Sequence, residues 1–189
     1  LYNQDEVLNH VLEFVGDGIQ HLSIDERLTI SNMTTEWGAL AGIFPVDNVT
    51  INWLKKRCEI IKKRGLENVP SDMDGINGNH PRLNEKNINN LYNQDLKADK
   101  NAFYFQEIKL DLSTVSPHIS GPNHVKTMIN IHDAEKQDII INKAYLVSCV
   151  NSRVEDLKAA ANVVRNKQIS PNVEFYIGAA SNEVQEQSE

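Results

Sequence analysis

Hydrophobic residues recur along the chain with two different periods, which predicts an alternation of strands and helices. Residues 144–147 form an apolar run that ends in a polar turn at residues 148–152. Apolar residues then recur at helical spacing up to residue 164, and a further apolar segment, residues 173–181, reads as the next strand. Residues 144–177 therefore predict a βαβ unit, whose two strands should be parallel with a right-handed crossover.

The same reading predicts further elements upstream. Helical spacing predicts helices over residues 4–15, from Ser23 to about residue 40, and over residues 50–64 with Gly65 closing the last one. Short strands are expected at residues 42–46 and 103–112, and turns at Ser116-Pro117 and at residues 121–123. Residues 173–181 should be followed by a helix that begins at Ser181.

Residues 66–102 differ from the rest of the chain. They are rich in Asn, Asp, Gly and Lys, with few aliphatic residues in any period. We expect a long surface insertion with one short helix at residues 85–92. Its acidic and amide residues invite comparison with a calcium loop, but their spacing does not fit one: Asp72, Asp74, Asn77 and Asn79. The chain thus divides into residues 1–65, 66–102 and 103–189.

Cys149 lies where the strand of residues 144–147 gives way to the following helix. Ser152 can cap that helix, and the side chain of Glu155, three residues later, can accept the backbone amide of Ser152, as in a capping box. The partial positive charge at a helix amino terminus lowers the pKa of a thiol, so a thiolate here could bind a metal or act as a nucleophile. From the position alone, a lone cysteine at a strand end is more often a small buried hydrophobe. Cys58 belongs to a helical apolar stripe and is expected to be structural.

Asn32 and Glu36 stand four residues apart in the second predicted helix and so should share one face. A polar pair on a helix face is usually only solvated. Met33, Trp37 and Leu40 flank this pair, so apolar surface could enclose it.

Composition excludes several classes of protein. A hydrophobic content of 40% is enough for a core, and the net charge of −7 argues against a non-specific nucleic-acid surface. No apolar run approaches the ~18 residues of a membrane span. Two cysteines do not make a disulfide framework, which favours a reducing compartment. Three histidines share no metal-ligand spacing: His118, His124 and His132.

Three sequence blocks resemble the aconitase superfamily of iron–sulfur hydro-lyases. SCVNSRVEDLKAAA, from Ser148, is similar to the first cluster-cysteine motif of the superfamily, and LTISNMTTEWGALAGIFPVD, residues 28–47, is similar to its NM-E-GA segment. LDLSTVSPHISGPN, residues 110–123, resembles a third block, and the three stand in the family's order. The segments EWGALAGIFPVD, SGPN and KAYLVSC most resemble the sequences of the fungal branch that interconverts homoisocitrate and homoaconitate in lysine biosynthesis.

The resemblance implies a fold and a site. It implies an α/β protein with three-layer α/β/α iron–sulfur subdomains and βαβ units, present here in part. Cys149 would be one iron ligand of a 4Fe-4S cluster, with Asn151 close to the cluster in the same turn. Glu36 would lie near the open iron and the substrate's hydroxyl, and Asn32 would hydrogen-bond the same site. Removing hydroxide from carbon needs a Lewis acid on oxygen and a carboxyl group that manages a proton.

The superfamily holds its cluster with three cysteines, two of them in a C-x-x-C pair downstream, and no such pair occurs here. We therefore expect a central fragment of a larger enzyme, inactive alone and without a stable cluster. Its partners would be a small tricarboxylic acid substrate, the missing domains of the same chain and further copies of itself, with no membrane or nucleic acid. By resemblance the compartment is the mitochondrial matrix, with the cytosol as the alternative.

Three alternatives stay open at this point. The large subunit of the isopropylmalate isomerase branch has near-identical motifs, and so do aconitases themselves. A non-catalytic α/β binding module is possible too, and it predicts a buried, inert Cys149. The superfamily's RNA-binding members make an RNA partner conceivable, but the acidic balance disfavours it.

Overall fold

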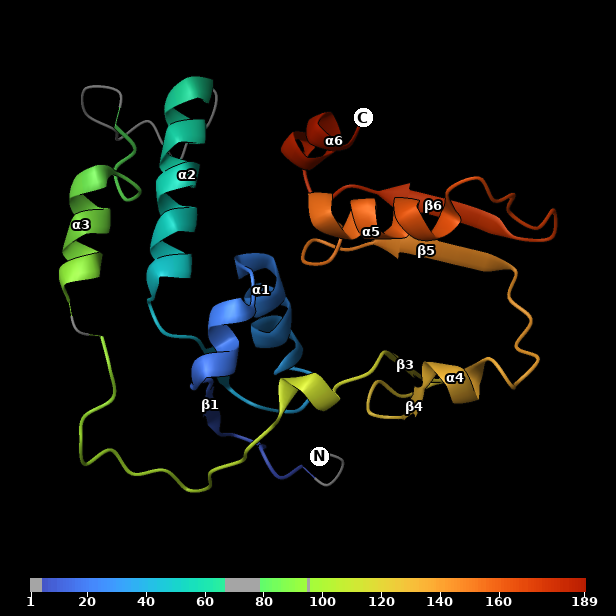
Figure 1. Cartoon of the computed structure of the whole chain (residues 1–189), viewed down its shortest axis with the longest axis horizontal. Coiled ribbons are helices and arrows are strands. Elements are labelled where there is room, and N and C mark those ends of the chain that lie inside the picture. Colours follow the sequence, from blue (N-terminus) through green and yellow to red (C-terminus); the bar gives the residue numbers. More distant parts are fainter. Residues whose placement is uncertain (1–4, 67–78, 95) are drawn as a thin grey trace. The chain divides into compact units, whose positions relative to one another are not determined.

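The computed structural model of the 189-residue chain describes residues 5–66, 79–94 and 96–189 (Figure 1). The described residues form helices and three two-stranded sheets, which confirms the α/β class. The chain divides into two compact units. One comprises Leu1–Leu12, Asp25–Gly42 and Ser113–Glu189, and the other comprises Glu13–Ile24 and Ile43–Leu112. None of the described helices combines the length and the apolar character that crossing a membrane requires.

The first unit contains the predicted βαβ arrangement. Strand β5, Lys143–Val147, pairs in parallel with β6, Glu174–Gly178, and α5, Val154–Val164, connects them. Helix α6, Asn182–Ser188, follows, and the Ser181 side chain accepts the amide of Val184 at 3.3 Å, as expected of its cap. The apolar run and the helical period were strong local signals, and both parallel strands are confirmed.

The predicted capping box of α5 is displaced by one residue. The N-cap is Arg153, and its backbone amide donates to Oδ2 of Asp156 at 3.1 Å. Ser152 is instead completely buried, and its carbonyl accepts the amide of Ala180 at 2.9 Å. The prediction of Ser152 and Glu155 as the capping pair was therefore wrong, because the backbone of Ser152 is already committed to the segment after β6.

The predicted helix at residues 4–15 is also wrong over its described part. Residues 6–9 form a turn, and strand β1, Val11–Glu13, follows and pairs with β2, Ala41–Ile43. Asp5 and Asn9 have φ values of 59° and 61°, which a right-handed helix excludes. The amide of Asn9 donates to the carbonyl of Gly38 at 3.0 Å, so long-range pairing replaces the helical bonds.

Helix α1, Ile24–Met33, ends about seven residues before its predicted limit. The hydroxyls of Thr34 and Thr35 bond the carbonyls three residues earlier, at 2.7 and 2.8 Å, and so compete with the helical ladder. A turn over residues 34–38 follows and ends at Gly38, whose φ is 82°. Glu36 therefore lies in this turn, and the expectation that it shares a helix face with Asn32 was wrong.

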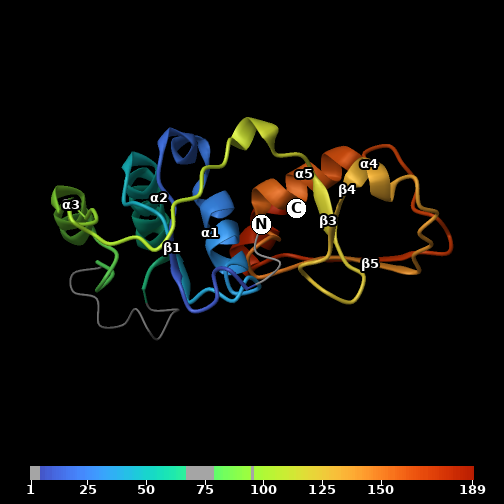
Figure 2. The ribbon, with the colours of Figure 1, turned by 90° about the horizontal axis from the view of Figure 1, so that it is seen from below.

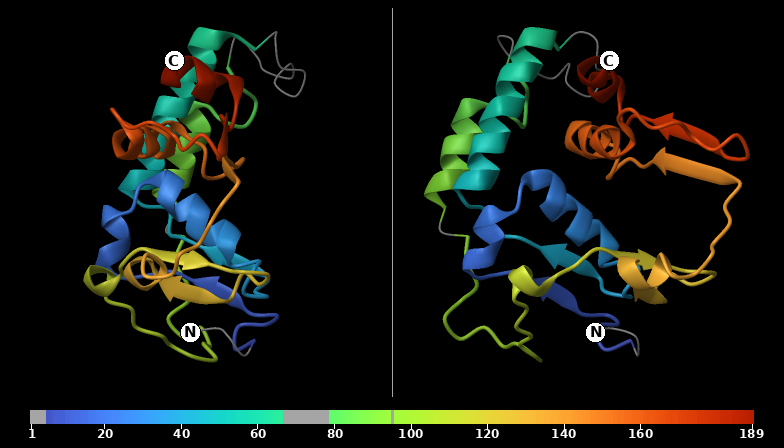
Figure 3. Two further views of the ribbon diagram at one scale, coloured as in Figure 1. Left: turned by 90° about the vertical axis from the view of Figure 1, so that its right-hand side faces the viewer. Right: turned by 45° about the vertical axis from the view of Figure 1, so that its right-hand side comes forward.

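The second unit is built around α2, Asn48–Arg64, and α3, Glu85–Asn93, which run side by side (Figure 3). Asp47 caps α2 and Asn84 caps α3 through side-chain bonds of 3.1 and 2.9 Å. Ile88 from α3 is buried against two residues of α2, Ile51 and Cys58, which confirms Cys58 as structural. Three of the residues compared with a calcium loop lie outside the described residues: Asp72, Asp74 and Asn77.

The strand expected at residues 103–112 does not form within the described part of the chain. Side chains of both parities are exposed there, Phe103 at 89% and Tyr104 at 54%, because alternation yields a strand only where a partner strand is available. Two short 3₁₀ segments are also present, Asp17–His21 and Leu112–Thr114.

The first unit also contains a small hairpin followed by a short helix. Strands β3, His118–Ser120, and β4, Met128–Asn130, form an antiparallel hairpin before α4, Ile131–Ala134 (Figure 2). The turn after Ser120, which includes Gly121 and Pro122, is confirmed.

Candidate functional site

Residues 148–152, here called the Cys149 turn, join β5 to α5 in the first unit. The hydroxyl oxygen of Ser148 accepts the amides of Val150 and Asn151, at 3.0 and 3.1 Å, which closes the turn locally. Cys149 is exposed on this turn at the carboxyl end of a parallel strand. Ligands of open α/β sheets bind at such ends, so the thiol stands where a ligand could reach it.

The Cys149 turn contacts helix α1 of the same unit through its Asn151 side chain. Nδ2 of Asn151 donates to Oγ1 of Thr29 at 3.1 Å, and this hydroxyl donates in turn to the carbonyl of Asp25 at 3.0 Å. Thr29 stands one helical turn before Asn32, and residues three apart on a helix are neighbours. Asn151 therefore contacts the helix that also carries Asn32, one turn further along.

A charge pair adjoins this hydrogen bond. Nη1 of Arg153 lies 3.3 Å from Oδ1 of Asp25, and both side chains are about one-third exposed or less. Neither Oδ1 of Asp25 nor Nε of Arg153 has a hydrogen-bond partner among the described residues. The pair is therefore an attraction between two partly buried charges without a well-directed hydrogen bond.

Glu36 presents an unusual carboxylate. Its Oε2 is enclosed but has no hydrogen-bond partner in the part of the chain that the structure describes. Its side chain makes no hydrogen bond or ion pair to the Cys149 turn within those residues. A buried polar atom without a protein partner is costly, and an unsatisfied oxygen of this kind often has a functional role. Asn32 is exposed, and its backbone carbonyl accepts both the amide and the hydroxyl of Thr35.

The described residues contain no group of three His, Cys, Asp or Glu side chains that could enclose a metal ion. His118 and His132 make local contacts, with the carbonyl of Ser116 and the carboxylate of Glu135. An iron–sulfur cluster is held mainly by thiolates, and Cys149 is the exposed cysteine of this chain. Its chemistry and exposure fit one ligand of such a cluster, so any other thiolates would come from outside these residues.

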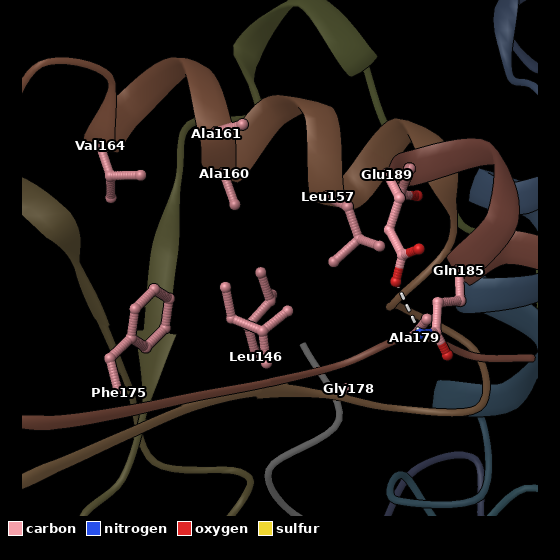
Figure 4. A pocket seen from close by; sticks show the side chains of 12 residues that line it. Leu146, Leu157, Ala160, Ala161, Val164, Phe175, Gly178, Ala179, Gln185 and Glu189 are labelled. Atoms are coloured by element: carbon pink, nitrogen blue, oxygen red, sulfur yellow. Dashed lines mark hydrogen bonds between the residues drawn. The ribbon is translucent and has the colours of Figure 1, made fainter.

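A separate cavity of about 480 Å³ lies between the β5–β6 sheet and helices α5 and α6 (Figure 4). Figure 4 shows Leu146 and Phe175 facing Leu157 and Val164 across it, with Gln185 and Glu189 bonded to each other at one end. Its lining is mostly aliphatic, its polar members Gln185, Ser188 and Glu189 all come from α6 and the residue after it, and Cys149 is not among its lining residues. The cavity is therefore a gap in hydrophobic packing and not the site suggested by Cys149.

Sequence reasoning did not find Asp25, Thr29 or the contact role of Arg153. Arg153 stands inside the SCVNSRVEDL block, so its position was visible but its partner was not. A threonine and an aspartate near a helix start give no signal for a contact 122 residues away.

The whole chain, residues 1–189, matches the family described as "Aconitase family (aconitate hydratase)", and the chain belongs to this family. Its similar relatives include proteins named "Homoaconitase, mitochondrial". The chain is 50% identical to that of Mycosarcoma maydis, 48% to that of Debaryomyces hansenii and 49% to that of Yarrowia lipolytica. Each match covers all of this chain and 25% of the relative. The chain thus spans about a quarter of the length of the curated relatives it matches.

Proposed function

We propose that the whole protein is an iron–sulfur hydro-lyase that interconverts homoisocitrate and homoaconitate in lysine biosynthesis, in mitochondria. One observation carries this proposal: a chain similar to homoaconitases throughout its length has its one exposed cysteine at the strand–helix junction of the SCVNSR block. The substrate class and the compartment are inferred from the names of these relatives.

In this proposal Cys149 would hold one iron of a 4Fe-4S cluster, with Asn151 in the same turn. The cluster, when bound, supplies a Lewis acid for the departing hydroxide. Dehydration removes a proton and a hydroxide from adjacent carbons, and a double bond forms between those carbons; hydration is the reverse. Asn32 and Glu36 have the chemistry for the remaining tasks. An amide can orient the hydroxyl, and a carboxyl group can manage a proton.

The unpartnered Oε2 of Glu36 supports its role, because a catalytic carboxylate is a recurrent reason for an unsatisfied buried oxygen. The exposure of Cys149 argues against the non-catalytic module, which predicted a buried thiol. The other enzyme branches act on isopropylmalate or on citrate, so the substrate that the reconstituted protein turns over fastest distinguishes them.

The first test is cluster uptake by the whole protein after anaerobic reconstitution with iron and sulfide. We expect a cluster spectrum with stoichiometric iron for the unmodified protein and for Cys58→Ala, and its loss for Cys149→Ala. The two variants carry the same substitution, one in the core and one on the turn. Uptake that survives Cys149→Ala would overturn the assignment of the thiol.

The second test is turnover of the reconstituted protein. We expect kcat/KM for homoaconitate to exceed that for cis-aconitate and for the isopropylmalate branch's substrate by at least about tenfold, a difference of about 1.4 kcal/mol. Glu36→Gln should lower kcat by about 10²–10⁴-fold, the range for one acid–base group, without loss of the cluster. Glu155→Gln, an exposed glutamate on α5, is the matched control and should leave kcat unchanged. A preference for another substrate would transfer the protein to that branch.

A further inference from the structure

Four residues form a continuous set of polar contacts: two on helix α1, one in the Cys149 turn and one directly after that turn. Asn151 donates to the Thr29 hydroxyl, which donates to the Asp25 carbonyl, while the Asp25 carboxylate faces Arg153. Asp25 thus takes part twice, with its backbone and with its side chain. The two contacts bracket the buried residue Ser152, so both sides of the turn's end are tied to the helix.

The proton of the Thr29 hydroxyl decides the orientation of the Asn151 amide. A threonine hydroxyl has one donor proton and two acceptor lone pairs. That proton is committed to the Asp25 carbonyl at 3.0 Å, so toward Asn151 the oxygen can only accept. The NH₂ group of Asn151 must therefore face Thr29, and its carbonyl oxygen is turned away from the helix. No hydrogen bond occupies that carbonyl oxygen within the described residues.

The Arg153–Asp25 pair acts on the other side of Ser152. Arg153 is the N-cap of α5, so holding its guanidinium also holds the first turn of that helix. With each side chain about one-third exposed or less, the attraction is weakly screened by solvent. A shift of the Cys149 turn away from α1 would separate both the charge pair and the hydrogen bond.

We propose that Thr29 and Asp25 are positioning residues, which hold the Cys149 turn against α1 and orient Asn151 beside the thiol. The importance of this role for catalysis rests on the proposed function, whereas the contacts of Thr29 and Asp25 do not depend on that function. Neither residue touches the reacting atoms in this proposal; each acts through Asn151 or Arg153.

The test uses the whole protein with two substitutions at one position. Thr29→Val removes the hydroxyl at constant shape, and Thr29→Ser keeps the hydroxyl. The matched control is Thr127→Val, at an exposed threonine between β3 and β4. In the apoprotein, hydrogen exchange of the amides in residues 148–152 reports how often the turn opens. In the reconstituted protein, the rate of cluster loss to an iron chelator reports positioning of the thiol.

Thr29→Val should accelerate exchange of the turn amides and cluster loss by about fivefold each, the ratio that corresponds to one hydrogen bond of about 1 kcal/mol. Thr29→Ser and Thr127→Val should match the unmodified protein. Unchanged exchange in Thr29→Val, or equal acceleration in Thr29→Ser, would overturn the contact. Faster exchange with unchanged cluster loss would overturn the positioning role. If the unmodified protein takes up no cluster, the proposed function fails while exchange still judges the contact.

Discussion

Replacing Ile88 by alanine tests whether α3 belongs to the core of its unit. The segment around α3 reads in the sequence as a polar surface insertion, yet Ile88 is only 2% exposed and packs with Ile51 and Cys58. If these contacts hold α3 on α2, removing the Ile88 side chain must open the cluster. If α3 merely rests on the surface, the substitution must cost little.

The size of the effect follows from the atoms removed. Ile→Ala deletes three carbons, each contributing about 0.8 kcal/mol when buried, and the residual cavity adds to the loss. The expected cost is about 3 kcal/mol, within the usual range of about 2–5 kcal/mol for such changes. This corresponds to about a hundredfold increase in the equilibrium constant for opening.

Cys58 supplies a local assay for this opening, since its thiol is 5% exposed in the same cluster. Its alkylation by a thiol reagent, followed by mass spectrometry of the Cys58 peptide, should accelerate about a hundredfold in Ile88→Ala. Ile60→Ala is the matched control, because Ile60 lies on α2 but is 36% exposed, and its effect should stay below about fivefold. Equal acceleration by both substitutions would refute the assignment of Ile88 to the core.

Three further outcomes are expected. The hydrogen bond and charge of Lys62 hold the pKa of Glu85 below its ordinary value of 4.5. The ion pair therefore stabilises the α2–α3 contact fully above pH 4.5, and this stabilisation is lost as the pH falls through the lowered pKa of Glu85. Lys62→Met should raise the Glu85 pKa toward 4.5 in a carboxyl NMR titration, and an unchanged value would contradict the pairing. In the cluster-free protein the exposed Cys149 should react with thiol reagents well before the buried Cys58, and the reverse order would be inconsistent with the fold. Gly65→Ala should lower the free energy of unfolding, measured by urea denaturation, by about 1 kcal/mol, because Gly65 has a φ of 87°, a conformation that alanine disfavours. An unchanged free energy of unfolding would contradict that geometry.

Elements with several agreeing local signals could be predicted from the sequence. Helix α2 has an apolar stripe and a glycine at its end, and its observed bounds differ little from the predicted residues 50–64. The βαβ unit has an unbroken apolar run, a polar turn and a helical period in succession. In both cases propensity, pattern and turn chemistry favour one structure, which is the condition for a reliable reading.

Elements whose pattern depends on distant partners could not be predicted. The helical spacing of residues 4–15 is real, but Asn9 adopts a left-handed conformation and pairs with Gly38. The alternation of residues 103–112 is also real, yet no neighbouring strand is present in the described part of the chain to complete a sheet. Periodicity reports which side chains could be buried together, whereas the element that forms depends on what is available to bury them.

The candidate site follows the same division between local and distant signals. The sequence left open whether the Cys149 thiol is exposed or buried, but its place in a short polar turn after β5 could be predicted from its neighbours. Its attachment to α1 could not, since Thr29 and Asn151 are 122 residues apart and their contact needs the tertiary fold. A site assembled in this way depends on residues that take no part in the reaction itself. Substitutions at Thr29 or Asp25 should therefore disturb the Cys149 turn, although neither residue would be chosen as catalytic from the sequence.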